Sequence, residues 1–217
     1  MAKVAPSILS ADFSNLALVL EQCEQGGADQ VHVDVMDGHF VPNLTIGPQV
    51  VKDLRKQTSL PLDVHLMIEY PQEYISQFVD AGADFITIHA ESSGDLQKTL
   101  KMIRNAGAKP GITLRPRSSL SLIKPYLSEV DLILAMSVEP GFGGQGFLPK
   151  SLERISSLRR LLQAEGSSDG QLSVDGGVKL DNAAEILAAG ADILVAGSAI
   201  FKTVDPVKTI RQFKMIQ

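Results

Sequence analysis

Short apolar runs alternate with longer amphipathic stretches along the chain. Four of the runs, VHVDV, FITIHA, KPGITL and ILVAG, each follow a turn that contains Gly-Ala. Each run is apolar on both faces, as a parallel strand covered by helices must be. The glycine before each run supplies the positive-φ residue that commonly ends a helix. The repeated unit is therefore a helix followed by a buried strand.

The same pattern, extended over the whole chain, predicts eight strands. They lie near residues 4–8, 30–35, 62–66, 85–89, 109–114, 132–136, 172–175 and 193–196. Helical stretches fill the gaps, for example at 15–25, and a loop is expected at 167–170. Eight strand-helix units predict an α/β fold, a (β/α)8 barrel with residues 1–217 as a single domain. A doubly wound open sheet is the alternative.

Composition narrows the class of partner. The formal net charge is -5 and aromatic residues make up 5% of the chain, which does not suit a nucleic-acid surface. The longest mostly apolar stretch, 183–201, is broken by charged residues and glycines, so no membrane span is expected. We therefore expect a small-molecule partner.

Two features of the sequence, its single cysteine and its first residues, suggest the cellular compartment of the protein. Cys23 cannot form an intramolecular disulfide, and its helical surroundings suggest a packing residue rather than a nucleophile. The first residues contain neither a signal h-region nor a transit-like segment. We expect a cytoplasmic protein, with the mature form of an organellar protein as the alternative.

Polar side chains with ligand chemistry stand at the ends of three predicted strands. His32 and Asp34 are two residues apart, so in a strand they point to the same side. Asp63 and His65 form a second pair, and Asp175 ends a later strand. In a barrel these strand ends meet at one mouth. Two imidazoles with carboxylates predict a divalent transition-metal site of the zinc, iron or manganese kind.

Glycine clusters follow the last three strands, at 140–146, 176–177 and 197–198. Barrel enzymes commonly bind a phosphate with the last loops and a short helix N-terminus, so a phosphorylated ligand is predicted. Ser198 is expected to cap that helix and to contact the phosphate. The loop from Gly141 to Gly146, with the apolar Phe142 and Phe147, is interpreted as a mobile lid.

Three methionines lie at the same rim. Met36, Met67 and Met136 are predicted to form an apolar layer that keeps water from a reactive anionic intermediate. His89 and Glu91 stand at the end of the fourth strand. We interpret His89 and Glu91 as a polar layer around the mouth rather than as part of the site.

Several segments together resemble the ribulose-phosphate 3-epimerase family. These are APSIL from Ala5, VHVDVMDGHFVPNLTIGP from Val31, LDVHLM from Leu62, SVEPGFGGQ from Ser137, VDGGV from Val174 and VAGS from Val195. The similarity runs from end to end. It implies an enzyme of the pentose phosphate pathway and the Calvin cycle that interconverts ribulose 5-phosphate and xylulose 5-phosphate.

The resemblance also implies roles for individual residues. One divalent metal would be held by His32, Asp34, His65 and Asp175, and the two aspartates would be the acid and the base. Zinc or iron(II) is expected, with manganese or cobalt as alternatives. The implied substrate contacts are Ser7, His65, Gly141, Phe142, Gly143, Gly144, Asp175, Gly176, Gly177, Gly197 and Ser198. A phosphorylated ketose substrate and a homo-oligomer are expected as partners.

One segment departs from the family pattern. Where the family usually has Leu-Asn-Pro-x-Thr-Pro after the fifth strand, this chain has Leu-Arg-Pro-Arg-Ser-Ser from Leu114 to Ser119. The departure removes no implied ligand but leaves the structure of that rim open.

Three alternatives remain at this point. They are a 3-epimerase for a six-carbon ketose phosphate, a non-catalytic phosphosugar-binding barrel, and a decarboxylase or aldolase. A Schiff-base enzyme of the last kind would need a lysine at a strand end, and none of the predicted ends has one.

Overall fold

A computed structural model describes residues 2–165 and 170–216. Its eight strands form one parallel sheet in the order β1-β8-β7-β6-β5-β4-β3-β2. The strands are β1 Lys3–Pro6, β2 Val31–Met36, β3 Leu62–Met67, β4 Phe85–His89, β5 Lys109–Leu114, β6 Leu132–Met136, β7 Gln171–Asp175 and β8 Ile193–Ala196. A parallel bridge between Ser7 and His32 joins β1 to β2. The sheet is thereby a nearly closed barrel, which confirms the predicted (β/α)8 fold and excludes the open sheet.

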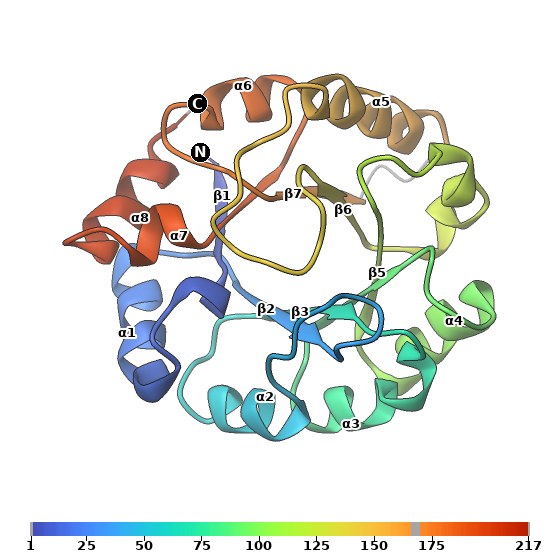
Figure 1. Ribbon diagram of the computed structural model, residues 1–217, viewed down its shortest axis with the longest axis horizontal. Helices are drawn as coiled ribbons and strands as arrows, with labels where there is room; N and C mark the ends of the chain where they lie inside the picture. The colour runs from blue at the N-terminus through green and yellow to red at the C-terminus, as the bar shows by residue number, and fades with distance from the viewer. Residues whose placement is uncertain (1, 166–169, 217) are drawn as a thin grey trace.

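Helices surround the ring of strands, as Figure 1 shows in a view down the barrel. They are α1 Leu16–Gly26, α2 Pro48–Arg55, α3 Ile75–Asp80, α4 Leu96–Ala106, α5 Ser151–Ala164, α6 Ala183–Ala188, α7 Ser198–Phe201 and α8 Pro206–Lys214. Gly27 and Gly107 end α1 and α4 in the left-handed conformation, as the turns predicted. The predicted loop at 167–170 falls mostly on residues 167–169, which lie outside the described residues.

The segment between β5 and β6 differs from the other helical connections. It contains two 3-10 helices, η4 at Leu120–Leu122 and η5 at Lys124–Glu129, in place of an α-helix. Pro125 has no N–H to donate within that short segment, which disfavours an α-helix there. The first strand is also shorter than predicted, because the chain turns into a 3-10 helix at Ile8–Ser10, η1.

Apolar side chains fill the space between sheet and helices and part of the barrel interior. The inner cluster consists of Ala5, Phe85, Leu132, Leu134, Met136, Val138, Ile193 and Val195. Cys23 is fully buried in the outer layer, which confirms it as a packing residue, and burial raises the pKa of its thiol to about 12. No helix in the described ranges is both long enough and apolar enough to cross a membrane.

The amino end of the barrel carries four aspartates, one before each even-numbered strand. Each pairs with a cation from a surrounding helix: Asp29 with Lys214, Asp84 with Arg55, Asp131 with Arg104 and Asp192 with Arg159. Three of these carboxylates also accept a backbone N–H from the neighbouring odd-numbered strand, at Val4, Leu62 and Leu172. This ring fixes the helices to the strands at the end opposite the predicted site.

Candidate active site

The carboxyl ends of β2 and β3 bring the predicted ligands together. The strand register sets Asp34 beside His65. Asp34 Oδ1 lies 3.0 Å from His65 Nδ1 and 3.3 Å from His32 Nε2. Its other oxygen accepts a hydrogen bond of 2.7 Å from Ser7 Oγ. All four residues are buried, so this carboxylate is fixed in position before any ligand binds.

Asp175, the last residue of β7, completes the cluster. One ligand atom from each of His32, Asp34, His65 and Asp175 can be chosen so that all four lie within 4.8 Å of one another. His32 Nε2 is buried and has no hydrogen-bond partner, so this nitrogen is free to bind a metal ion. Two imidazole nitrogens and two carboxylates from three strands fit zinc, iron(II) or manganese. The residues present therefore suit one divalent metal.

Two further groups contact the histidines from behind. Asp63 Oδ2 lies 2.8 Å from His32 Nδ1, on the side of the ring away from the cluster. His89 Nε2 lies 2.9 Å from His65 Nε2, and the His89 side chain is fully buried. The interpretation of His89 as part of a polar layer around the mouth was therefore wrong. Its i, i+2 spacing to Glu91 repeats that of His32 and Asp34, and this was the available signal.

The two aspartates of the cluster have pKa values that are shifted in opposite directions. Burial would raise the pKa of Asp34, but the imidazoles of His32 and His65 hold the pKa of this carboxyl well below its usual range. Burial, followed by the nearby charge of Asp34, raises the pKa of Asp175 to about 6. One carboxyl therefore stays ionised while the other gains and loses a proton near neutral pH.

The surroundings of His32 favour a positive charge on its ring. Burial disfavours a charged imidazole, but Asp34 and Asp63 on either side raise the pKa of His32 well above its ordinary value. Surroundings that favour an extra proton on this ring also favour a metal ion at the same nitrogen.

Glycine loops line the other half of the mouth. The cavity includes Ser7, Gly141, Phe142, Gly143, Gly144, Gly176, Gly177, Gly197 and Ser198. Gly177 has a φ of +65°, and a Cβ there would lie 2.3 Å from Phe147 N, so a side chain at this position is excluded. Gly197, not Ser198, is the N-cap of α7. The prediction that Ser198 caps this helix was wrong, because Ser198 is its first helical residue.

The methionines meet at the mouth as predicted. Met36 and Met67 are neighbours in the register of β2 and β3, and they cluster with Val41, Leu9 and Phe40. Met136 stands beside Asp175 at the end of β6, and all three methionines line the cavity. The methionine side chains beside the four-residue cluster are thus apolar and nearly inaccessible to water.

The loop after β6 crosses in front of the barrel centre (Figure 1, yellow). Asn43 Nδ2 donates a 2.8 Å hydrogen bond to Gly141 O, which connects this loop to the one after β2. Gln145 Nε2 donates to the carbonyls of Glu139 and Phe142, and 54% of Phe142 is exposed. Phe147 packs against the main core. The loop is well placed for the predicted lid, and its movement stays a prediction.

The rim that departs from the family pattern is tied to the site. The guanidinium of Arg115 lies 4.5 Å from the ring centroid of Phe40 and donates to Phe40 O. The backbone N–H of Arg115 and the hydroxyl of Ser118 both donate to Glu91 Oε1. Burial would raise the pKa of Glu91, but the neighbouring His89 ring and then the hydrogen bond from Ser118 lower it to about 2. Glu91 is therefore ionised.

Comparison with known proteins gives a consistent result. A model described as the ribulose-phosphate 3 epimerase family matches residues 3–201. The chain is 47% identical over 214 residues to ribulose-phosphate 3-epimerase from Bacillus subtilis (strain 168), covering 99% of both chains. It is 48% identical to the chloroplastic ribulose-5-phosphate-3-epimerase of Arabidopsis thaliana, covering 97% of this chain and 75% of that one.

Solved structures of more distant sequence share the fold. KGPDC from Streptococcus mutans superimposes with a TM-score of 0.70 at 15% identity, covering 99% of this chain and 96% of the other. 3-Hexulose-6-phosphate synthase gives a TM-score of 0.65 at 19% identity, with all of both chains covered. At these identities the likeness concerns the barrel alone.

Proposed function

Because the chain belongs to the ribulose-phosphate 3-epimerase family of isomerases, we propose that its site interconverts D-ribulose 5-phosphate and D-xylulose 5-phosphate through two acid-base residues and one divalent metal. The observation that carries this mechanism is the pair Asp34 and Asp175. They belong to β2 and β7, which β1 and β8 separate in the ring, and their carboxyl groups meet at one cluster.

Inversion at C3 requires a proton to leave one face of the carbon and another to arrive on the opposite face. Removal of the C3 proton beside the ketone gives a planar enediolate. One aspartate takes that proton, and the other, in its protonated form, donates a proton to the opposite face. The opposite pKa shifts of Asp34 and Asp175 suit a resting state with one ionised and one protonated carboxyl. In the reverse reaction the two roles exchange.

His32, His65, Asp34 and Asp175 would hold the metal, which when bound supplies Lewis-acid stabilisation of the charge on the enediolate oxygens. Zinc or iron(II) is proposed, with manganese or cobalt as alternatives. Ser7 holds Asp34 through its 2.7 Å hydrogen bond and thereby fixes the direction of that carboxylate. Met36, Met67 and Met136 exclude water, which would otherwise protonate the intermediate from solvent.

The phosphate is proposed to bind on the glycine side of the mouth, against the loops at Gly176, Gly177 and Gly197 and against Ser198. Positive-φ glycines at 176 and 177 expose backbone there, and N–H groups free of side chains suit an anion. Ser198→Asp places a negative charge at this position. It should raise KM for ribulose 5-phosphate about tenfold or more, because the added charge repels the phosphate. Zinc content, the control, should stay unchanged. An unchanged KM would place the phosphate elsewhere.

The proposed activity is tested by incubating the purified zinc-loaded protein with ribulose 5-phosphate in D2O. Xylulose 5-phosphate carrying deuterium at C3 is the expected product, read by NMR. A six-carbon ketose phosphate, the alternative substrate, serves as the comparison, and faster turnover of that sugar would reassign the specificity. Absence of C3 exchange with either sugar would reject the epimerase mechanism.

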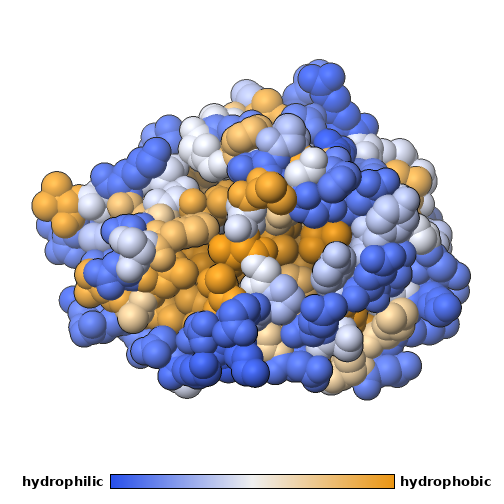
Figure 2. All heavy atoms as spheres, turned by 60° about the horizontal axis from the view of Figure 1, so that its bottom comes forward, coloured by the Kyte–Doolittle hydropathy of each residue, from blue (hydrophilic) through white to orange (hydrophobic). Residues whose placement is uncertain are grey.

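We further propose a homo-oligomer that covers an apolar face. With the α1, α2 and α3 side turned forward, Figure 2 shows a hydrophobic area surrounded by hydrophilic side chains. A groove near the starts of α2 and α3 is lined by residues that include Leu44, Ile46, Ile68 and Phe78, and Leu44 is 74% exposed. Such areas commonly mark contacts between proteins. Light scattering should give a multiple of 23.3 kDa, and Leu44→Glu should reduce it; a monomeric parent would contradict the proposal.

A further inference from the structure

His65 is in contact through both of its ring nitrogens. Its Nδ1 faces Asp34 Oδ1 at 3.0 Å, inside the metal cluster, and its Nε2 faces His89 Nε2 at 2.9 Å, outside the cluster. Two imidazole nitrogens approach this closely only when one proton lies between them, donated by one ring and accepted by the other. The direction of this single hydrogen bond decides which nitrogen of His65 is left to bind a metal.

Glu91 settles the direction from the other side of His89. Its Oε2 lies 3.5 Å from His89 Nδ1, within ion-pair distance, and neither of these buried atoms has a hydrogen-bond partner in the described ranges. A carboxylate is an acceptor only, so the proton of His89 belongs on Nδ1, toward Glu91. His89 Nε2 then accepts a hydrogen bond from His65 Nε2–H, so that His65 can offer the lone pair of Nδ1 to a metal. Without a metal, Asp34 Oδ1 at 3.0 Å favours a proton on that same Nδ1, so Glu91, acting through His89, and Asp34 favour opposite tautomers of His65.

We infer that Glu91 and His89 are positioning residues that keep His65 in its metal-binding tautomer. Asp63 does the same for His32 by a direct contact of 2.8 Å to Nδ1, which leaves Nε2 for the metal. The two imidazole ligands thus have equivalent supports, one of them a single carboxylate and the other a carboxylate acting through a second imidazole. Such partners commonly raise metal affinity 10–100-fold.

The unusual rim after β5 fixes Glu91 in this role. Arg115 N–H and Ser118 Oγ both donate to Glu91 Oε1, which leaves Oε2 for His89. Arg154 Nη2 in turn donates to the carbonyls of Arg115 and Ser118, at 3.1 and 2.8 Å. The segment after β5 therefore supports a metal-ligand tautomer through a backbone N–H and a hydroxyl, groups that the family pattern also has at these two positions.

The inference rests on the proposed metal site, so its readout is zinc affinity rather than turnover. Glu91→Gln keeps the size of the side chain but offers an amide N–H to His89 Nδ1. That donor reverses both hydrogen bonds, because His89 then donates to His65, whose remaining proton moves to Nδ1. Competition with a chromogenic chelator should show zinc affinity lowered about 10–100-fold. In the zinc-loaded parent, long-range ¹H–¹⁵N spectra should show the proton of His65 on Nε2 and the proton of His89 on Nδ1.

We call the contacts from Glu91 through His89 to His65 the relay. Two further variants distinguish an effect of this relay from the simple loss of a negative charge. Glu69→Gln removes a negative charge near the carboxyl end of β3 without touching the relay, and it should leave zinc affinity within about twofold of the parent. His89→Gln can present an amide oxygen to His65 Nε2–H and no longer depends on Glu91. In that background Glu91→Gln should have no further effect, a coupling that a double-mutant cycle measures.

Each outcome decides between distinct claims. Unchanged zinc affinity in Glu91→Gln would overturn the relay and leave the proposed metal site intact. An equal loss with and without His89 would show that Glu91 acts through its charge and would also overturn the relay. A parent protein that binds no zinc, iron(II), manganese or cobalt would instead reject the metal site itself.

Discussion

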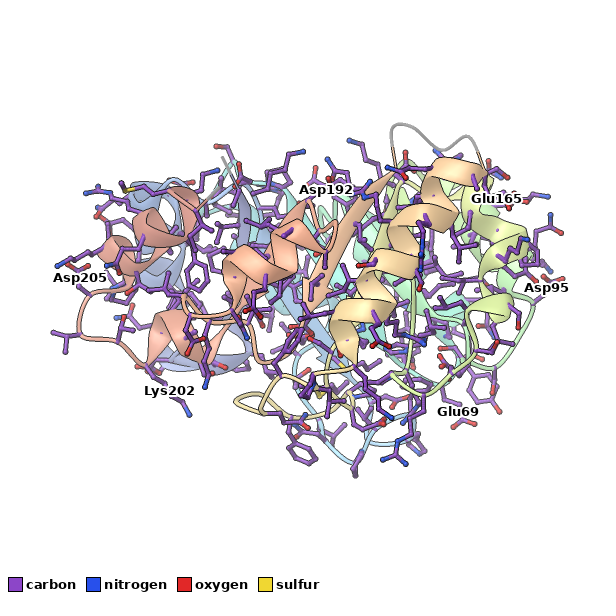
Figure 3. All side chains as sticks on the ribbon, turned by 90° about the horizontal axis from the view of Figure 1, so that it is seen from above. Glu69, Asp95, Glu165, Asp192, Lys202 and Asp205 are labelled. Atoms are coloured by element: carbon purple, nitrogen blue, oxygen red, sulfur yellow. The ribbon has the colours of Figure 1, made fainter. Side chains whose placement is uncertain are left out.

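The two ends of the barrel use aspartate for opposite purposes. In Figure 3 Asp192 lies at the amino end of the strands and Glu69 at the carboxyl end, on opposite sides of the molecule. At the amino end, aspartates pair with Lys or Arg, whose charges are permanent near neutral pH. At the carboxyl end, Asp34 faces imidazoles and Asp175 faces Asp34. A carboxylate with a permanent cation beside it strengthens the fold, whereas one beside imidazoles keeps its charge available for a metal or a proton.

The strongest test of this comparison removes the metal. A chelator should abolish epimerisation, and zinc, iron(II), manganese or cobalt should restore it, because both imidazoles and both carboxylates of the site are close enough to bind one ion. His32→Ala should behave like the chelated enzyme. Asp84→Asn at the amino end, as the control, should retain metal content and turnover. Full activity in protein shown to be metal-free would refute the carboxyl-end assignment.

The next largest effect concerns the two catalytic candidates. Asp34→Asn and Asp175→Asn should each lower epimerisation by about 10²–10⁴, the usual loss for a positioned acid or base. Each variant should still exchange the C3 proton of one of the two sugars with deuterated solvent, and the preferred sugar should differ between the variants. Metal content is measured in both by elemental analysis, since each aspartate is also a proposed ligand. Epimerisation within about tenfold of the parent in both metal-loaded variants would assign the protons to other residues.

The amino end should respond in stability alone. Asp192→Ala removes the acceptor for Leu172 N–H and the partner of Arg159. Because the Asp192 side chain is 38% exposed, solvent screens the pair, and the variant should lose about 1–2 kcal/mol of unfolding free energy. Calorimetry should show a Tm lower by roughly 2–8 °C. A fall in turnover of metal-loaded Asp192→Ala at 25 °C would contradict the division between the two ends.

The smallest effect is one of pH, in zinc-free protein. The raised pKa of Asp175, about 6, means that its ionisation opposes folding, so this contribution to stability is lost as pH rises from about 4 through 6. The lowered pKa of Asp34 acts in the opposite sense, since its contribution is present above about pH 4 and is lost as pH falls. Carboxyl ¹³C shifts should show Asp175 titrating near 6 and Asp34 still ionised at pH 3. Titration of both near 4 would remove the electrostatic difference between them.

Sequence alone predicted the barrel and the four-residue cluster for a clear physical reason. Alternation along a strand puts His32 and Asp34 on one side, and parallel strands collect their carboxyl ends at one mouth. The supports of the histidines depend instead on register between strands, which sets His32 beside Asp63. No pattern within one strand contains that information. The i, i+2 spacing marks His89 and Glu91 as a pair, but the contact of His89 with His65 depends on how β4 lies against β3.

Two local errors have local causes. The segment between β5 and β6 was expected to be helical like the others, but Pro125 and the short span from Leu120 to Glu129 leave only 3-10 turns. Ser198 was taken as a helix cap because serine is common there, yet Gly197 occupies the cap and the helix starts at Ser198. In both cases a helical segment was correctly predicted, but the 3-10 hydrogen bonding of the first and the N-cap residue of the second were not.

The contact that closes the barrel, between β1 and β2, is the place where local unfolding is expected to begin. Strands β1 and β2 share no ladder and are joined by the Ser7–His32 bridge at the mouth and by Asp29 contacts to Val4 at the amino end. This seam has the fewest cross-strand hydrogen bonds in the ring, so local unfolding is expected to begin there. The bridge at the mouth is formed by His32, a proposed metal ligand, and Ser7, the donor for Asp34. A bound ion would therefore stabilise the contact between β1 and β2 against local unfolding. Amide exchange along β1 should slow when zinc is added.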